Sequence, residues 1–180
     1  MLVNSLRFFI VYISWVLLFV LQKPCFMLCH HALFKQSSFA DYWQVMMHGL
    51  PLDFSVAGYF SAIPGILILI EIWYRGRFTQ WFRKGYNAVA ALIFSVIFGL
   101  NLVLYGYWGF PLDSTPLYYF FSSPASALAS VSVWMVIVGI LVVLLIAVGV
   151  YLLMQRVEKW LGAFVKTNRH RIGSTLLQLV

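Results

Sequence analysis

The sequence predicts an all-α membrane protein: a polytopic bundle of transmembrane helices with four full spans, the start of a fifth, and short amphipathic helices at the interface. Hydrophobic residues make up 63% of the 180 residues, against roughly 45–50% in soluble globular domains. Charged residues make up 9%, against about 25% in such domains. Apolar runs of the roughly 20 residues that a helix needs to cross a bilayer recur along the chain. These three observations exclude a soluble fold.

Four apolar segments are long enough to be transmembrane helices. They cover residues 8–28, 55–73, 86–107 and 131–154. The first segment is followed by KPCFMLCHH, which has no small-residue cleavage site, so the sequence favours an uncleaved anchor over a signal peptide. A fifth apolar run begins at about residue 172, and the remaining residues to 180 are too few to cross a bilayer. We therefore expect a single transmembrane domain, residues 1–180, that ends within its fifth helix.

The lysines and arginines predict the orientation of these spans. In the four-span topology most of them fall on one side of the membrane, namely Arg7, Arg75, Arg77, Arg83, Lys84, Arg156, Lys159, Lys166, Arg169 and Arg171. Because cytoplasmic loops are enriched in Lys and Arg, the N-terminus is predicted to be cytoplasmic. The net charge of +7 then indicates anionic phospholipids on the cytoplasmic side as partners, and nucleic acid is not expected.

Two short amphipathic helices are predicted beside the spans. Ser38 followed by Asp41 is typical of a helix start, and Gly49 before Pro51 is typical of a helix end, so residues 39–49 should form a helix at the outer interface. Residues 157–165 carry an apolar stripe and basic residues on the other face, which predicts a helix on the cytoplasmic membrane surface.

Polar residues within the apolar segments are candidate functional positions. Lys23 is either buried beside a partner, which would mark a functional site, or it extends outward where Pro24 bends the helix; the second interpretation is favoured. Asn101 is expected to bond to a neighbouring helix. Glu71 stands four residues before Arg75, which predicts an ion pair on the helix surface.

Two aspartates occupy similar contexts, GLPLD at Asp53 and GFPLD at Asp113, where outer loops meet spans. Paired carboxylates could act as acid and base or bind a cation. Each aspartate also suits the start of a helix, and this capping role is the favoured interpretation. Together with His48 and Tyr107, they are our candidates for contacts with lipid headgroups or for anchoring the loops.

Cys25 and Cys29 stand one helical turn apart and are followed by His30. Thiolate and imidazole ligands could hold zinc or copper, but a second pair of ligands at recognisable spacing is missing, so this site is only a weak alternative. The sequence contains no GxSxG, HExxH, Walker or Rossmann motif. We therefore predict no catalytic residue, metal or cofactor site within this chain.

Two segments resemble the membrane domain of the lipoteichoic-acid-synthase-like proteins, the sulfatase-fold phosphoglycerol transferases, in the form found in Bacteroidetes. HGLPLDFSVAGYFSAIPGIL at 48–67 is similar to the start of their second span, and NLVLYGYWGFPLDSTPLYYFFSSPASALAS at 101–130 is similar to the outer loop after their third. The resemblance in span number, orientation and segment order covers essentially the whole chain. Family members commonly have arginine where this chain has Pro51 and Pro111, so a headgroup role for these positions does not carry over.

The resemblance implies a bacterial cytoplasmic membrane protein in which five transmembrane helices precede a large extracytoplasmic catalytic domain of the alkaline phosphatase superfamily. That domain would carry a threonine nucleophile and a divalent metal such as manganese, and would be the main partner of this chain. Its substrates would be lipid headgroups at the outer face of the membrane. No catalytic residue of the family lies within these 180 positions.

The alternative is a stand-alone small multi-pass protein that acts as a transporter subunit or an assembly factor. Such a protein needs polar groups that converge near the middle of the membrane at broken helices. The sequence offers Pro64-Gly65, Gly99 and Asn101 for that purpose. The anchor interpretation is the one that the sequence favours.

Overall fold

The computed structural model of the chain describes residues 2–73, 76–109, 118, 121–122 and 132–177. This part of the chain is helical, as the composition predicts. Its long helices are α1 (Leu2–Cys29), α2 (Phe39–Trp73), α3 (Arg77–Trp108) and α6 (Val133–Leu177). Each of the four contains a segment long and apolar enough to cross a membrane. The predicted fold class, a polytopic transmembrane helix bundle, is confirmed.

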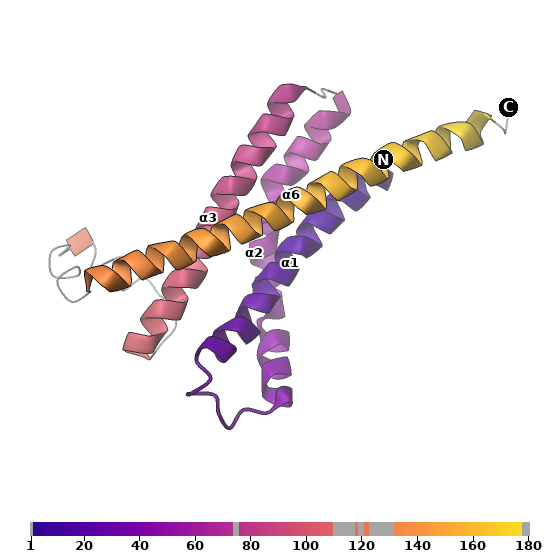
Figure 1. Cartoon of the computed structure of the whole chain (residues 1–180). Coiled ribbons are helices and arrows are strands. Elements are labelled where there is room, and N and C mark those ends of the chain that lie inside the picture. Colours follow the sequence, from indigo (N-terminus) through magenta and orange to yellow (C-terminus); the bar gives the residue numbers. More distant parts are fainter. Residues whose placement is uncertain (1, 74–75, 110–117, 119–120, 123–131, 178–180) are drawn as a thin grey trace.

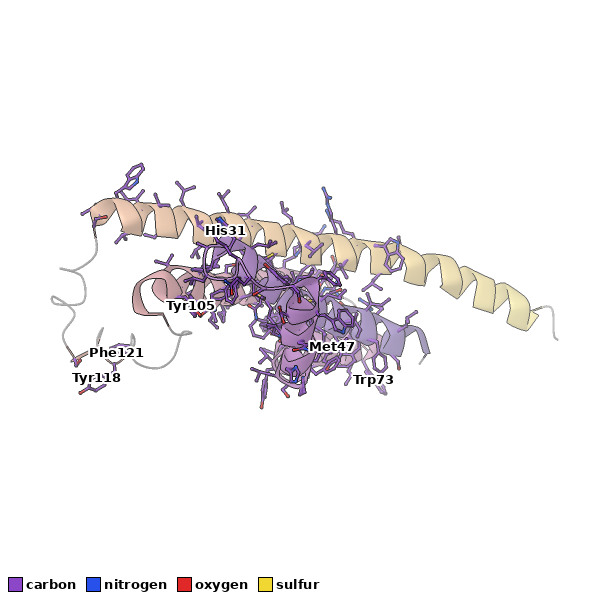
Figure 2. All side chains as sticks on the ribbon, turned by 90° about the horizontal axis from the view of Figure 1, so that it is seen from below. His31, Met47, Trp73, Tyr105, Tyr118 and Phe121 are labelled. Carbon is purple, nitrogen blue, oxygen red and sulfur yellow. The ribbon has the colours of Figure 1, made fainter. Side chains whose placement is uncertain are left out.

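The helices form two antiparallel hairpins that cross each other. The helix pairs with the most extensive contacts are α1 with α2 and α3 with α6, while smaller contacts join α1 to α6 and α2 to α3. Figure 1 shows α6 crossing the other helices and continuing past the N-terminal end of α1. Seen from below, α6 lies along one side of the other three (Figure 2). The direction of the chain therefore alternates from each long helix to the next.

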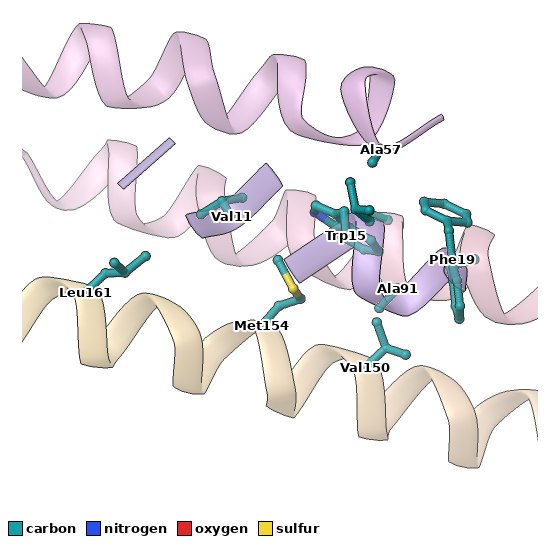
Figure 3. Close-up of a cluster of buried hydrophobic side chains, with 11 residues drawn as sticks. Val11, Trp15, Phe19, Ala57, Ala91, Val150, Met154 and Leu161 are labelled. Carbon is teal, nitrogen blue, oxygen red and sulfur yellow. The ribbon is translucent and has the colours of Figure 1, made fainter. Parts of the chain in front are cut away.

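The hydrophobic core lies where the hairpins cross. Trp15 and Phe19 of α1 pack against Phe60 of α2 and Phe94 of α3, with ring centroids 4.8 to 6.4 Å apart. Small residues admit these rings: Ala57, Ala90 and Ala91 are at most 2% exposed. From the fourth helix, Val150, Met154 and Leu161 point toward the same cluster (Figure 3). Close packing around small residues is the usual way that membrane helices associate.

The outer amphipathic helix and the second span are one continuous helix, which corrects two predicted boundaries. Ser38 and Asp41 interact at the start of this helix, as predicted: the backbone N–H and the hydroxyl of Ser38 donate to the Asp41 carboxylate, at 2.6 and 3.0 Å. Gly49 and Pro51 do not end it, because α2 runs through both to Trp73. A proline in a helix removes one backbone hydrogen bond, whereas a break within lipid would leave several groups without partners.

Two further boundaries differ from prediction on the basic side of the bundle. Helix α3 begins at Arg77, so Arg83 and Lys84 lie in a helix rather than in a loop. Helix α6 continues without interruption to Leu177 and includes the predicted surface helix at 157–165. The described part of the chain therefore holds four spans, and the apolar run from 172 to 177 extends α6 instead of starting a separate fifth helix.

Candidate functional site

A chain of ion pairs joins all four helices at the end of the bundle that carries the basic residues. Arg7 of α1 contacts Glu71 of α2 at 3.0 Å, and the other oxygen of Glu71 contacts Arg83 of α3 at 2.8 Å. The Nε atom of Arg83 then contacts Glu158 of α6 at 3.1 Å. The amide of Asn87 donates to the second Glu158 oxygen at 2.9 Å. We call these five residues the ionic network.

The ionic network is neutral and largely buried. The side chain of Glu71 is 5% exposed, that of Arg7 is 10% exposed and that of Arg83 is 17% exposed. Two guanidinium groups balance two carboxylates, and each carboxylate accepts from two donors. Removing charges from water costs several kcal/mol per ion, roughly, so a buried network of this kind is stable only when every charge is paired. Arg83 is the residue that connects the two halves, because its planar fork reaches both glutamates.

A small cavity of about 10 Å³ lies beside the ionic network. Arg7, Arg83 and Glu158 line its polar side, and Pro64 and Ile68 lie among its apolar walls. This volume corresponds to about one water molecule. The cavity has the size of a hydration site rather than of a binding site for an organic substrate.

The alternating chain direction explains why these four charged residues meet. Arg7 and Arg83 lie near the start of α1 and α3. Glu71 lies near the end of α2 and Glu158 just past the middle of the longer α6, which run in the opposite direction, so all four fall at one membrane level. Glu71 does not lie on the helix surface as predicted, because its side chain faces the bundle interior, while its pairing with Arg75 stays a prediction. Arg75 lies outside the described residues.

A second buried ion pair joins Lys23, near the end of α1, to Asp53, in the first half of α2. The Lys23 ammonium group contacts the Asp53 carboxylate, whose side chain is 4% exposed. Lys23 is 16 residues beyond Arg7 in α1, which corresponds to about 24 Å of helix. The two ion-paired sites therefore lie near opposite faces of a hydrocarbon core about 30 Å thick.

This pair corrects the interpretation of both residues. Lys23 does not extend outward past Pro24; its side chain is 19% exposed and points to α2, so the buried alternative holds. Asp53 does not cap the start of a helix, since it lies well inside α2. The surrounding lipid explains why the two residues pair. A single charge is costly within a membrane, and an ammonium and a carboxylate in contact neutralise each other.

Gly49 provides the space that Lys23 occupies. A Cβ atom at Gly49 would collide with the Cε and Nζ atoms of Lys23. Gly49 and Asp53 are one turn apart on α2, so the lysine side chain lies over the glycine and ends at the carboxylate. Gly49 thus permits a close approach of α1 to α2 rather than ending a helix.

A hydrogen bond between helices compensates for the proline in the middle of α2. Pro64 has no N–H, so the carbonyl of Phe60, four residues earlier, loses its helical donor. The hydroxyl of Tyr86 in α3 donates to this carbonyl at 2.9 Å. The bond joins the two hairpins, and it lies between the ionic network and the opposite end of the bundle.

The remaining predicted site residues do not gather at either ion-paired site. His48 is exposed, with Nδ1 2.8 Å from the Gln44 carbonyl oxygen. Asn101 is half-buried in α3, and its predicted bond to a neighbouring helix stays a prediction. Tyr107 lies near the end of α3. Asp113 lies outside the described residues, so a pairing with Asp53 is not tested.

Cys25 and Cys29 are exposed on α1, and His30 follows in the turn. The His30 ring packs against Phe26 and Tyr105, with centroids 4.7 and 5.2 Å apart. Within the described ranges, no group of three or more histidine, cysteine, aspartate or glutamate residues is placed to hold a metal ion. His30 therefore belongs to an aromatic contact between α1 and α3.

The sequence contains a signal for the ionic network, although none of the predicted sites includes it. An ionisable residue lies near the basic end of each predicted span, and the signs alternate along the chain as Arg7, Glu71, Arg83 and Glu158. In an alternating topology such a pattern places opposite charges at the same depth. The chain matches no protein family, no curated protein and no solved structure.

Proposed function

We propose that this chain is the membrane anchor module of a sulfatase-fold phosphoglycerol transferase, or of a related phosphoryl or sulfuryl transferase, in the bacterial cytoplasmic membrane. The ionic network is the observation that carries the anchor role. Each spanning helix contributes one buried charge, and each charge pairs with a charge from another helix. A network in which every charge is paired favours one arrangement of the helices over others, as an anchor requires.

The transferase part of the proposal rests on the resemblance of residues 48–67 and 101–130 to that family. The catalytic domain would be the C-terminal partner of this chain and would supply the divalent metal. Because α6 runs to Leu177 on the basic side of the bundle, a further crossing after the described residues would bring that domain to the outer face. The chain itself would hold that domain in place, because the ionic network keeps the four helices in one arrangement. The catalytic domain would then stand at a constant height above the outer leaflet, where lipid headgroups lie.

The size of the native protein tests this proposal. An antibody against residues 34–50, a segment whose side chains are mostly exposed, is used to blot membranes of the source cell. The proposal expects a band far above 20.7 kDa, the mass of this chain. A band near 20.7 kDa would contradict it and would indicate the stand-alone protein.

One observation favours the stand-alone alternative, a transporter subunit or assembly factor. Lys23 and Asp53 form a buried ionisable pair in apolar helices, and such pairs frequently line ion or substrate pathways. The double variant Lys23→Leu/Asp53→Leu separates the two functions. In an anchor it should leave the release of labelled phosphoglycerol from phosphatidylglycerol within about twofold of the unmodified protein. In a transporter it should abolish transport.

The proposed orientation has a direct test. Single cysteines are placed at Lys35 or Lys84, both exposed, after Cys25 and Cys29 have been changed to serine. A membrane-impermeant maleimide should label position 35 in intact cells and position 84 only after lysis. The reverse pattern would place the N-terminus outside and overturn the proposed orientation.

A further inference from the structure

Among the residues that the structure describes, the basic end of the bundle exposes positive charge on one hairpin only. Four cations of the α3–α6 hairpin are exposed, Arg77, Lys84, Arg156 and Lys159, and none of them forms an ion pair with a described residue. At the same level the α1–α2 hairpin presents Arg7, which is buried and paired with Glu71. Its neighbours Leu6 and Phe9 are exposed and apolar.

Acidic side chains do not balance these four cations. The chain has five acidic residues, and both glutamates are inside the ionic network. Asp41 and Asp53 belong to the opposite end of α2, and Asp113 follows the opposite end of α3 in the sequence. The four exposed cations are therefore without anionic partners in the described part of the protein.

Exposed tryptophans place these cations at the membrane interface. Trp73, Trp81 and Trp160 are 92%, 75% and 60% exposed, and Trp81 and Trp160 are interspersed with the four cations along α3 and α6. Tryptophan is enriched at the level of lipid headgroups, where one part of the ring is apolar and the N–H reaches polar groups. Cations at that depth meet the phosphates of phospholipids.

We infer that the α3–α6 hairpin binds the headgroups of anionic phospholipids through Arg77, Lys84, Arg156 and Lys159, whereas the α1–α2 hairpin at this end contacts lipid without selecting charge. The lipids that surround the basic end of the protein are thus enriched in anionic headgroups beside α3 and α6 and are not enriched beside α1 and α2. This inference depends only on the membrane embedding and not on the proposed transferase. Free phosphate and phospholipid headgroups both offer a phosphate group to these cations. The tryptophans at the same depth indicate that the bound phosphate belongs to lipid.

The test uses the full chain purified in detergent and incubated with equal amounts of phosphatidylglycerol and phosphatidylcholine. Native mass spectrometry gives the ratio of the two bound lipids. A phosphatidylglycerol with a photoreactive headgroup, followed by peptide mapping, gives the location of the bound lipid. The same sample is incubated with inorganic phosphate at the concentration of the lipid, to distinguish a lipid site from a general phosphate site.

We expect phosphatidylglycerol to be enriched and its cross-links to lie on α3 and α6. The variant Arg77→Gln/Lys84→Gln and the variant Arg156→Gln/Lys159→Gln should each lower the bound-lipid ratio by about thirtyfold, which is about fivefold for each cation removed. Lys35→Gln, an exposed lysine in the opposite loop, is the matched control and should leave the ratio unchanged. Circular dichroism and gel filtration confirm that each variant is folded.

Three results would overturn the inference. One is an equal amount of the two lipids on the unmodified chain, and another is cross-linking to α1 as frequent as to α3 and α6. The third is displacement of the lipid by inorganic phosphate. Because the first two measurements use the unmodified chain, they decide the question even if a variant fails to fold.

Discussion

The two buried ion-paired sites differ in what they connect. The ionic network takes one charge from each of four helices, and its central bond between Arg83 and Glu71 joins the two hairpins. The Lys23–Asp53 pair connects only α1 and α2, within one hairpin. The comparison teaches that the same chemistry acts at two levels: one site holds the hairpins together, and the other fixes the position of helices within a hairpin.

The choice of cation follows this difference. A guanidinium group has five donors in a planar fork, so Arg83 contacts Glu71 and Glu158 through different nitrogen atoms. An ammonium group on a flexible chain suits a single carboxylate, which is what Lys23 meets at Asp53. The two sites should therefore respond differently when an arginine is exchanged for a lysine or a cation is removed.

Removal of Arg83 should have the largest effect. Arg83→Met leaves Glu71 and Glu158 buried with one polar partner fewer each, and we expect the free energy of unfolding to fall by about 3–5 kcal/mol. Arg83→Lys should recover only part of this loss, because one ammonium group does not reproduce both contacts. Unfolding in mixed detergent micelles measures the change, with Arg77→Met at an exposed position as the control.

The same variant tests whether the ionic network joins the hairpins. The distribution of distances between a label on α1 and a label on α6 should become broader in Arg83→Met. The distribution between labels on α1 and α2 should stay the same. Equal broadening of the α1–α6 and the α1–α2 distances would contradict the division of roles between the two ion-paired sites.

Removal of Lys23 should have an intermediate effect. Lys23→Met leaves the Asp53 carboxylate buried without its partner, and we expect a loss of about 2–3 kcal/mol, measured by the same unfolding experiment. The double variant Lys23→Met/Asp53→Leu removes both charges and should return to within about 1 kcal/mol of the unmodified protein. Additive losses in the double variant would indicate that the pair is not coupled.

Closing the space at Gly49 should have a smaller effect. In Gly49→Ala the new Cβ displaces the end of the Lys23 side chain, and we expect a loss of about 1 kcal/mol. Gly58→Ala on the same helix is the control, since no atom lies within 4 Å of its new Cβ, and it should stabilise the helix by about 0.5–1 kcal/mol. In a Lys23→Ala background the loss at Gly49 should disappear, and a loss that persists there would show that another contact causes it.

The hydrogen bond between the hairpins should have the smallest effect. Tyr86→Phe removes the donor to the Phe60 carbonyl and should cost about 0.6 kcal/mol, the average for such bonds in membrane proteins. Pro64→Ala restores a backbone N–H for that carbonyl, so in this background Tyr86→Phe should be neutral. The four unfolding free energies of this cycle give the coupling, and a coupling of zero would reject the compensation.

Much of the fold follows from hydropathy alone, because lipid allows few backbone conformations. The predicted spans coincide with apolar stretches of the observed helices, and the predicted interaction of Ser38 with Asp41 at the start of α2 is confirmed. The errors are at helix ends. Gly49 and Pro51 end helices in water, where a freed carbonyl bonds to solvent, but within a membrane the helix continues through them.

The ion-paired sites are harder to predict for a geometric reason. Membrane depth follows from position in the sequence, but the face that a helix turns to its neighbours does not. Lys23 and Asp53 stand out separately in the sequence, and their pairing depends on the rotation of α1 and α2 and on the space at Gly49. The predicted pair of Glu71 with Arg75 follows from their spacing of four residues, which the sequence gives directly. The contacts of Glu71 with other helices depend on how the helices pack, which the sequence does not give.

The alternating charges also affect how the protein enters the membrane during synthesis. The first hairpin contains Arg7, Lys23, Asp53 and Glu71, so it can insert as an electrically neutral unit once its two internal pairs form. The second hairpin contains the Arg83–Glu158 pair and is neutral in its interior for the same reason. Neither hairpin needs to wait for the other before its buried charges are compensated. The Arg83–Glu71 bond joins residues of different hairpins, so it requires both of them to be in place.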